Sequence, residues 1–547
     1  MVTSVHELAS QAGIKMLRAG GNAVDAAVAT GFALAVVYPQ AGNLGGGGFL
    51  LLRNANGKTH FIDFRERAPA AATENMYLDA HGNVIPESSK ESSLVGYRAI
   101  GVPGTVAGLV YAEKQYGKLS IDKVIAPAIE LAREGFPLAY EDTQDLKNDQ
   151  YLALFPESKR VFLRDGNYYR PGEIFRQPEL ARTLERLARD PDEFYHGAMA
   201  RELAAAIHQG GGHVTPQDLA AYEVKEREPV RGSYRGYDII SAPPASSGGV
   251  ALVEILNILE GFDLGKLGNH SGAAIHLEAE AFRRAFYDRT DFLGDPDYAK
   301  IPVAQLIDKK YAAAWRESID PNHASVSKDL KRPSFAELER VAQSHSAAIR
   351  ESQNTTHYSV VDADGNAVAV TTTLNDIFGS RVTAEGLGFL LNDEMDDFAA
   401  KQGVPNVYGL IQGPANAIGP GKRPLSAMTP TIVLRDGKLF LVLGSPGGPR
   451  IITTVANILI GVVDFSLDIQ EAVNAPRFHH QWLPDEILVE DRLSPDTMDV
   501  LRSKGHRLEI DYSWGDWGDG ECIMIDPRTG ERLGASDGRN NGKAVGY

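Results

Sequence analysis

A candidate nucleophile lies in residues 354–362, where the sequence runs Asn-Thr-Thr-His-Tyr-Ser-Val-Val-Asp. If the chain were cut before Thr355, that residue would carry both a hydroxyl that can attack a carbonyl and a free α-amine. An α-amine has an ordinary pKa of about 7.7–8.0, so it could accept the hydroxyl proton near neutral pH. One residue would then supply nucleophile and base, a known variant of the serine triad. Taken alone, such a run is more often half of an ordinary β-hairpin.

The residues that follow predict the partner of this strand. Asp364-Gly365 is a turn signal between two alternating runs, so 355–362 and 367–374 are predicted to pair as strands. Alternation places two sets of side chains on common faces, Thr355, His357 and Ser359 on the first strand and Thr371 and Thr373 on the second. We expect Thr373 to orient the attacking group and Asn375 to reach a bound substrate. The alternative for Thr373 is the general preference of threonine for strands.

A glycine pair could stabilise negative charge. Gly447-Gly448 follows an apolar run and precedes residues 451–463, which are predicted to form a helix. N–H groups at a helix start carry positive dipole character, and glycine allows close approach of a substrate. The pair is therefore a candidate oxyanion hole, in which one donor is typically worth about 3–4 kcal/mol in the transition state. The alternative is a routine turn between a strand and a helix.

Charged residues could bind the two ends of an amino acid. The guanidinium of Arg65 could hold a carboxylate through two hydrogen bonds. Glu394 and Asp397 could bind an ammonium group, and a zwitterion needs one cation and at least one anion. The alternatives are a surface ion pair of Arg65 with Glu66 or Asp63, and a solvated acidic loop around Glu394.

The rest of the chain predicts an α+β protein. Helical periodicity covers residues 6–36, 105–135, 178–208 and 252–288, with a break near Gly261 in the last of these. Strands are predicted at 49–52, 60–63, 431–434 and 439–443, and turn signals at Asn56-Gly57 and Asp436-Gly437 separate the two pairs. Residues 320–350 are polar and are predicted to form a surface or mobile segment that leads into the proposed cut.

Composition excludes several classes of function. The chain has 547 residues, 43% of them hydrophobic, which suits a globular protein with a large core. Its net charge of −17, from 55 basic and 72 acidic residues, argues against a nucleic-acid partner. No apolar stretch reaches the roughly 18 residues needed to span a bilayer. Cys522 is the only cysteine, so neither an intrachain disulfide nor a cysteine-based metal site can form.

A histidine pair and a glycine run resemble a metal site and a phosphate loop, but each lacks a required part of the motif. Adjacent His479 and His480 point in different directions and lack a third ligand at helical spacing, so we expect structural roles and no metal. The glycine run at 45–48 lacks the Gly-Lys-Ser/Thr ending of a phosphate loop and is predicted to allow close packing near the active site.

The 354–362 segment resembles the processing site of the gamma-glutamyltranspeptidases, a family of N-terminal nucleophile hydrolases. Further motifs resemble the family in its own order over nearly the whole chain, at residues 20–27 (GGNAVDAA), 42–49 (GNLGGGGF), 63–66 (DFRE), 103–105 (PGT), 246–249 (SSGG), 392–398 (NDEMDDF), 424–426 (PLS), 444–448 (GSPGG) and 477–482 (RFHHQW). Each motif is weak alone, but together they are highly specific.

The resemblance implies a four-layer αββα sandwich and cleavage between Asn354 and Thr355. Residues 1–354 would form a large subunit and residues 355–547 a small catalytic subunit of one αββα unit. The implied activity is that of a gamma-glutamyltransferase, which splits glutathione and related compounds and passes the acyl group to water, amino acids or peptides. No cofactor is implied. Family members are commonly exported, which implies a periplasmic or secreted protein, although residues 1–21 lack the features of a signal peptide.

The resemblance also implies a substrate pocket. Ser426 and Asn375 would join Arg65, Glu394 and Asp397 in binding the amino-acid end of the γ-glutamyl group. Residues 403–412 resemble the family's lid, in which Tyr408 would cover the pocket and exclude water. Tyr408 could alternatively be an exposed loop aromatic.

One departure from the family pattern affects specificity. Many bacterial members have a second serine after Ser426, whereas this chain has Ala427. The missing hydroxyl could weaken recognition by roughly 0.5–1.5 kcal/mol. A related cephalosporin or glutaryl acylase-type amidase therefore stays open, although Arg65 and the acidic pair argue against a full switch. An unprocessed binding homologue is a separate alternative, against which the intact Asn354-Thr355 junction argues.

Overall fold

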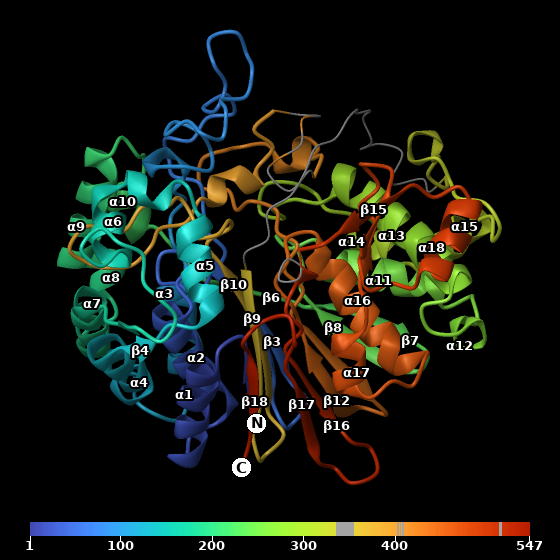
Figure 1. Ribbon diagram of the computed structural model, residues 1–547, viewed down its shortest axis with the longest axis horizontal. Helices are drawn as coiled ribbons and strands as arrows, with labels where there is room; N and C mark the ends of the chain where they lie inside the picture. Colours follow the sequence, from blue (N-terminus) through green and yellow to red (C-terminus); the bar gives the residue numbers. More distant parts are fainter. Residues whose placement is uncertain (335–354, 402–403, 405, 407–409, 514–516) are drawn as a thin grey trace.

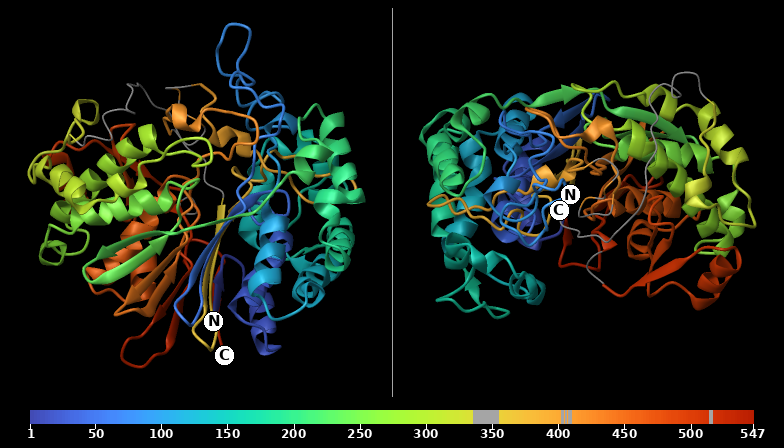
Figure 2. Two further views of the ribbon diagram at one scale, coloured as in Figure 1. Left: turned by 180° about the vertical axis from the view of Figure 1, so that it is seen from behind. Right: turned by 90° about the horizontal axis from the view of Figure 1, so that it is seen from above.

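Two β-sheets pack face to face between two layers of helices in the computed structural model (Figure 1). The structure describes residues 1–334, 355–401, 404, 406, 410–513 and 517–547. Viewed from behind and from above, the two helical layers again lie on opposite sides of the paired sheets (Figure 2). The expected four-layer αββα sandwich is confirmed.

The first sheet contains the strand that begins at Thr355. Its strands, in spatial order, are β18 (Lys543–Val545), β1 (Val2–Ser4), β9 (Thr355–Val361), β10 (Ala367–Thr373), β2 (Gly47–Arg53), β3 (Thr59–Asp63) and β6 (Lys225–Arg227). All neighbours in it are antiparallel. The termini lie close together, because β1 pairs with β18 and Val2 is opposite Val545.

The second sheet carries the glycine pair at the end of one strand. Its strands, in spatial order, are β17 (Arg532–Ala535), β16 (Cys522–Ile525), β12 (Lys438–Leu443), β11 (Thr431–Arg435), β8 (Tyr237–Ser241) and β7 (Val230–Tyr234). Smaller sheets join β13 (Phe478–His479), β14 (Ile487–Glu490) and β15 (Leu508–Asp511), and β4 (Phe136–Pro137) with β5 (Ile174–Phe175).

An apolar layer fills the space between the two large sheets. It includes Phe49 and Phe61 from the first sheet and Ile432 and Val442 from the second. The two phenylalanine rings stack with their centroids 5.4 Å apart. The opposite faces of the sheets bury a second set of apolar residues under helices, so strands such as β9 and β10 are buried along their whole length.

Helices cover the outer face of each sheet. The first sheet is covered by helices from the first 220 residues: α1 (Glu7–Arg18), α2 (Ala23–Val37), α3 (Thr105–Tyr116), α4 (Ile121–Glu134), α5 (Tyr140–Asn148), α6 (Pro156–Phe162), α7 (Pro178–Arg189), α8 (Glu193–His196), α9 (Ala198–Gln209) and α10 (Pro216–Ala220). Every residue of α2 is buried, which explains its alanine-rich sequence. Asn22 and Asp25 form a capping box that fixes where α2 begins.

Later helices cover the second sheet. They are α11 (Gly248–Leu259), α12 (Leu264–Leu267), α13 (Gly272–Phe292), α14 (Val303–Leu306), α15 (Lys309–Glu317), α16 (Arg450–Val463), α17 (Ile469–Asn474) and α18 (Pro495–Ser503). No helix in the described part of the chain is long and apolar enough to cross a membrane.

The predicted hairpins and helical regions are confirmed. β9 pairs with β10 and β11 with β12, and the break predicted near Gly261 lies between α11 and α12. Of the predicted polar segment, residues 320–334 are described and are mostly exposed or half-buried. Within it, the half-buried Arg332 forms ion pairs through its guanidinium with buried Asp288 and Asp291.

Candidate active site

The start of β9 places Thr355 directly opposite Thr373 of β10. The Thr355 hydroxyl donates to the Thr373 hydroxyl at 3.2 Å, and the backbone N–H of Asn375 donates to the same Thr373 oxygen at 2.9 Å. Thr373 is thus fixed by the chain that follows β10. The predicted pairing is confirmed, and its geometry suits a residue that orients the Thr355 hydroxyl.

These two threonines lie in the wall of a pocket. It is lined by Arg65, Arg289, Thr355, Thr373, Asn375, Glu394, Asp397, Leu410, Leu425, Ser426, Ala427, Met428, Gly448, Pro449 and Ile451. Eight of the residues predicted from the sequence to act on a substrate therefore line one cavity: Thr355, Thr373, Gly448, Arg65, Asn375, Glu394, Asp397 and Ser426. Thr355 and Thr373 come from neighbouring strands of the first sheet, and the others from a 3-10 turn and loops far apart in the sequence.

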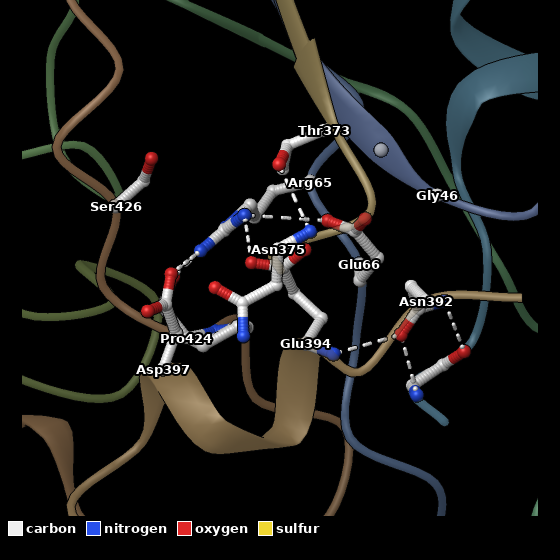
Figure 3. A network of polar contacts seen from close by, with 12 residues as sticks. Gly46, Arg65, Glu66, Thr373, Asn375, Asn392, Glu394, Asp397, Pro424 and Ser426 are labelled. Atoms are coloured by element: carbon white, nitrogen blue, oxygen red, sulfur yellow. Dashed lines mark hydrogen bonds and ion pairs between the residues drawn. The ribbon is translucent and has the colours of Figure 1, made fainter. Parts of the chain in front are cut away.

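Arg65 lies just beyond β3 and forms the centre of a buried charge network (Figure 3). Its guanidinium contacts the carboxylates of Glu394 and Asp397, and lies 3.5 Å from Glu66. Its Nε donates to the carbonyl of Pro424 at 3.3 Å. The ion pair with Glu66 does exist, but it is fully buried, so the alternative of a surface ion pair is wrong.

The network shifts the pKa values of its members. Burial alone would lower the pKa of Arg65, but the charges of Glu394, Asp397 and Glu66 outweigh it and raise that pKa. Burial raises the pKa of Glu66 to about 7 and that of Glu394 well above its ordinary value, although Arg65 opposes both shifts. The site therefore holds a guanidinium that stays charged beside carboxyls that take up protons easily.

The loops that carry Glu394 and Ser426 are firmly held. Glu394 and Asp397 lie on a 3-10 turn, Glu394–Asp397, and Glu394 is buried, so a solvated acidic loop is also excluded. The side-chain amide of Asn375 donates to the carbonyl of Asp393 at 3.1 Å. The Ser426 hydroxyl accepts from the backbone N–H of Met428 at 3.0 Å, which leaves its proton available for a ligand.

The glycine pair joins β12 to α16 as predicted. Gly447 has a φ of 125° and Gly448 a φ of 52°, both in the region that favours glycine. Gly448 lines the pocket with Pro449 and Ile451, whereas Gly447 lies outside the lining. The N-terminus of α16 thus borders the same cavity as Thr355.

The run of four glycines allows close packing around the site. A Cβ on Gly46 would lie 2.0 Å from the carbonyl oxygen of Thr373, and one on Gly47 would lie 2.4 Å from the carboxylate of Glu66. Larger residues would displace both. The prediction of close packing is confirmed.

Two of the residues predicted from the sequence, Asn354 and Tyr408, lie outside the residues that the structure describes. Cleavage before Thr355 and the lid therefore stay predictions. Of the lid segment, Leu410 lines the pocket, and the Asn406 side chain donates to Asp397 at 3.5 Å.

The histidines predicted to be structural have protein partners. His479 contacts Thr453 at 2.9 Å and Gln481 at 2.8 Å, and His480 accepts from the backbone of Trp482 at 3.0 Å. Burial lowers the pKa of His479 to about 3 and that of His480 to about 4, so both are neutral at pH 7.

A different cluster has a composition that could bind a metal. Side-chain ligand atoms of His276, Glu280 and His506 lie within 4.8 Å of one another, away from the pocket lining. The two imidazoles already contact each other at 2.7 Å, and Glu280 forms ion pairs with Arg283 and Arg284. These contacts satisfy the cluster without an ion.

One pocket residue was missed in the sequence. Arg289 lies on α13 in the polar stretch Asp288 to Asp291, which is typical of a solvated helix face. The helix is instead buried over most of its length, and Arg289 is 1% exposed. Hydrophobic periodicity gives no signal for a buried arginine.

Comparisons of the whole chain with known proteins point to one family. The family model for gamma-glutamyltranspeptidase matches residues 9–547. The glutathione hydrolase proenzyme of Escherichia coli (strain K12) is 50% identical over 543 residues, which cover 99% of this chain and 90% of that protein. The crystal structure of cephalosporin acylase from Bacillus halodurans superposes with a TM-score of 0.85 at 27% identity, covering 100% of this chain and 95% of that one. Helicobacter pylori gamma-glutamyltranspeptidase gives a TM-score of 0.58 at 45% identity over 60% of this chain and 93% of its own. The chain therefore belongs to the gamma-glutamyltranspeptidase family.

Proposed function

We propose that this protein is an autoprocessing gamma-glutamyltransferase that cleaves the γ-glutamyl amide bond of glutathione and similar compounds. The observation that carries the proposal is the pairing of Thr355 with Thr373 in the wall of a cavity that Arg65, Glu394 and Asp397 also line. A nucleophile and groups of both charges lie in one cavity, which matches the chemistry of a zwitterionic acyl donor.

Processing would create the catalytic base. The Thr355 hydroxyl attacks the carbonyl of Asn354, and the peptide becomes an ester that water cleaves. The products are a large subunit, residues 1–354, and a small subunit, residues 355–547. The freed α-amine of Thr355 can then accept a proton near neutral pH.

The same hydroxyl would then attack the γ-carbonyl of the donor. The N–H groups of Gly447 and Gly448 stabilise the oxyanion, and the α-amine of Thr355 passes the proton to the leaving amine. Thr373 orients the hydroxyl. Water or the amine of an amino acid or peptide then attacks the resulting ester and receives the γ-glutamyl group, which frees the Thr355 hydroxyl. These steps draw nucleophile, base and oxyanion donors from the chain itself, so they require no cofactor.

The charged pocket would bind the amino-acid end of the donor. Glu394 and Asp397 accept hydrogen bonds from the α-ammonium group, while Arg65, Ser426 and Asn375 serve the α-carboxylate. Tyr408 would close over the pocket. By likeness to its relatives, we place the protein in the periplasm or outside the cell.

A second candidate function keeps the nucleophile and changes the acyl group. Ala427 lines the pocket where a second serine hydroxyl is expected, and a cephalosporin acylase shares the fold over the whole chain. A glutaryl acylase-type amidase would use the carboxylate subsite but no ammonium subsite. A non-catalytic homologue would remain one uncut chain.

Intact-mass spectrometry followed by a substrate comparison tests these functions. We expect two fragments, the smaller beginning at Thr355, and faster hydrolysis of a γ-glutamyl anilide than of the glutaryl anilide. Faster hydrolysis of the glutaryl compound would instead identify an acylase. A single chain that never matures would refute the catalytic assignment, because Thr355 would lack its base.

A further inference from the structure

A polar side chain, that of His357, lies in the layer between the two sheets, close to the start of β9. It is fully buried and follows Thr355 by two residues, on the same face of the strand. Both ring nitrogens have partners. Nδ1 lies 2.8 Å from the hydroxyl of Thr371, which is opposite His357 on β10, and Nε2 lies 3.1 Å from the hydroxyl of Ser359. No step of the proposed reaction uses this imidazole.

The direction of these hydrogen bonds follows from the carbonyl at their end. The Ser359 hydroxyl donates its one proton to the carbonyl of Glu521 at 2.8 Å, so it accepts from Nε2 of His357. Nδ1 is then the acceptor for the Thr371 hydroxyl. Burial lowers the pKa of His357 to about 3, so the imidazole is neutral at pH 7. The hydrogen bonds thus run from β10 of the first sheet to the residue before β16 of the second.

The imidazole also lies against the chain that leads to the glycine pair. A Cβ on Gly444 would lie 2.2 Å from Cε1 of His357, so the ring packs directly on the backbone at the end of β12. The carbonyl of Gly444 accepts from the N–H of Glu521 at 3.2 Å, and the carbonyl of Glu521 is the one that ends the hydrogen bonds from His357. Gly447 follows three residues later. His357 therefore lies between the strand that begins at Thr355 and the segment that leads into the turn.

The distance between this strand and this turn matters for acyl transfer. The substrate carbonyl carbon must reach the Thr355 hydroxyl while its oxygen reaches the N–H groups of the turn. A misplacement of about 1 Å can lower a rate on the order of 100-fold. Because β9 and β12 belong to different sheets, strand pairing does not set this distance. Side chains packed between the sheets must set it.

We propose that His357 is a positioning residue, whose imidazole sets the distance between Thr355 and the turn that carries Gly447 and Gly448. The inference rests on the proposed function and adds a residue to it. The imidazole holds the two segments apart without taking up or releasing a proton, so the α-amine of Thr355 remains the base.

The test measures kcat and KM for a γ-glutamyl anilide per processed site, with the processed fraction taken from intact mass. We expect His357→Gln to lower kcat by about 10- to 100-fold, because the amide cannot reproduce the ring and both of its contacts. KM, and competitive inhibition by L-glutamate, should change by less than about 3-fold, because the acyl subsite is untouched. The acidic limb of the pH profile of kcat should not move, because His357 does not titrate there.

A smaller change serves as the test if the glutamine variant fails to fold. Thr371→Val keeps the shape of the side chain and removes the hydroxyl that donates to Nδ1 of His357. It should lower kcat by about 3- to 10-fold, because the imidazole loses one of its two hydrogen bonds. Thr371→Ser keeps the hydroxyl and should retain most of the rate.

A matched control is His506→Gln. His506 is also a buried histidine that contacts another side chain, that of His276 at 2.7 Å, and it lies outside the pocket lining. This change should cost stability and leave kcat unchanged. An unchanged kcat in the His357 variant, a change confined to KM, or a shifted acidic limb would each overturn the inference. Failure of the unmutated, processed protein to hydrolyse the γ-glutamyl donor would instead refute the proposed function, so the two failures are distinguishable.

Discussion

At the scale of single residues, the site depends on how the hydroxyl of Thr355 is held. Thr355 is 6% exposed, and its oxygen lies 3.2 Å from that of Thr373. Thr373 also accepts from the backbone N–H of Asn375, which fixes its oxygen beside that of Thr355. The role we propose for Thr373 is to keep the attacking oxygen in place while the α-amine removes its proton.

Replacement of Thr373 tests this role. We expect Thr373→Ala to lower kcat by about 10-fold, because the hydrogen bond that orients the Thr355 hydroxyl is lost. KM should change little, because no contact with the γ-glutamyl substrate is removed. Thr373→Ser keeps the hydroxyl and should retain most of the activity. Steady-state kinetics with a γ-glutamyl anilide on fully processed protein checks the prediction. A change confined to KM would place Thr373 in substrate binding.

At the scale of elements, the sequence predicts structure that is encoded within a short segment better than pairing between distant segments. The β9–β10 hairpin was predictable because Asp364-Gly365 and alternation lie within one short segment. Strand β1 was not predictable, since it has three residues and pairs on both sides with segments more than 300 positions away. The meeting of Arg65 with Glu394 and Asp397 followed from family resemblance, because no local pattern brings them together. Arg289 had no such signal.

The turn before α16 is an element whose shape can be tested. Gly447 has space for a methyl group, with its nearest contact at 3.5 Å, but its φ of 125° strains any other residue. Gly447→Ala should shift the N–H groups at the helix start and lower kcat on the order of 100-fold. Gly437→Ala, in the β11–β12 turn at a φ of 72°, is the control, and it should cost stability without changing kcat. Comparable kcat values in the two variants would exclude Gly447 from the oxyanion hole.

Buried histidines that join elements should make stability depend on pH. His479 of β13 contacts Thr453 of α16, and burial lowers its pKa to about 3. Below about pH 6.5 this histidine binds a proton in the unfolded chain but not in the folded one. Its contribution to the free energy of unfolding is therefore fully present above pH 6.5 and is lost as pH falls towards 3. Between pH 7.5 and 5 the free energy of unfolding falls by about 2 kcal/mol from this cause.

Urea unfolding at these two pH values measures the effect. On going from pH 7.5 to pH 5, the free energy of unfolding should fall by about 2 kcal/mol less in His479→Gln than in the unmutated protein. This difference does not depend on the stability of the variant at pH 7.5. His81 is exposed, so His81→Gln is the control and should leave the pH dependence unchanged. An unchanged slope in His479→Gln would show that this histidine does not resist protonation.

At the scale of the whole molecule, the proposed subunits share both sheets. In the first sheet, β1 of the large subunit lies between β9 and β18 of the small one, and β10 pairs with β2. In the second, β11 of the small subunit pairs with β8 of the large one. A cut before Thr355 therefore divides the chain but leaves each sheet continuous. The apolar layer between the sheets also draws on both subunits.

The cleaved protein should accordingly behave as one folding unit. We expect the two fragments to elute together in size-exclusion chromatography, even in 1 M salt, because backbone hydrogen bonds and apolar packing hold them and salt screens only exposed charges. Denaturant should separate them in a single transition in which loss of activity and loss of secondary structure coincide. Release of an intact, folded large subunit before this transition would contradict the prediction. Coincident transitions would mean that the proposed nucleophile, Thr355 of the proposed small subunit, and Arg65 of the large one are held in position by the same sheets that form the core.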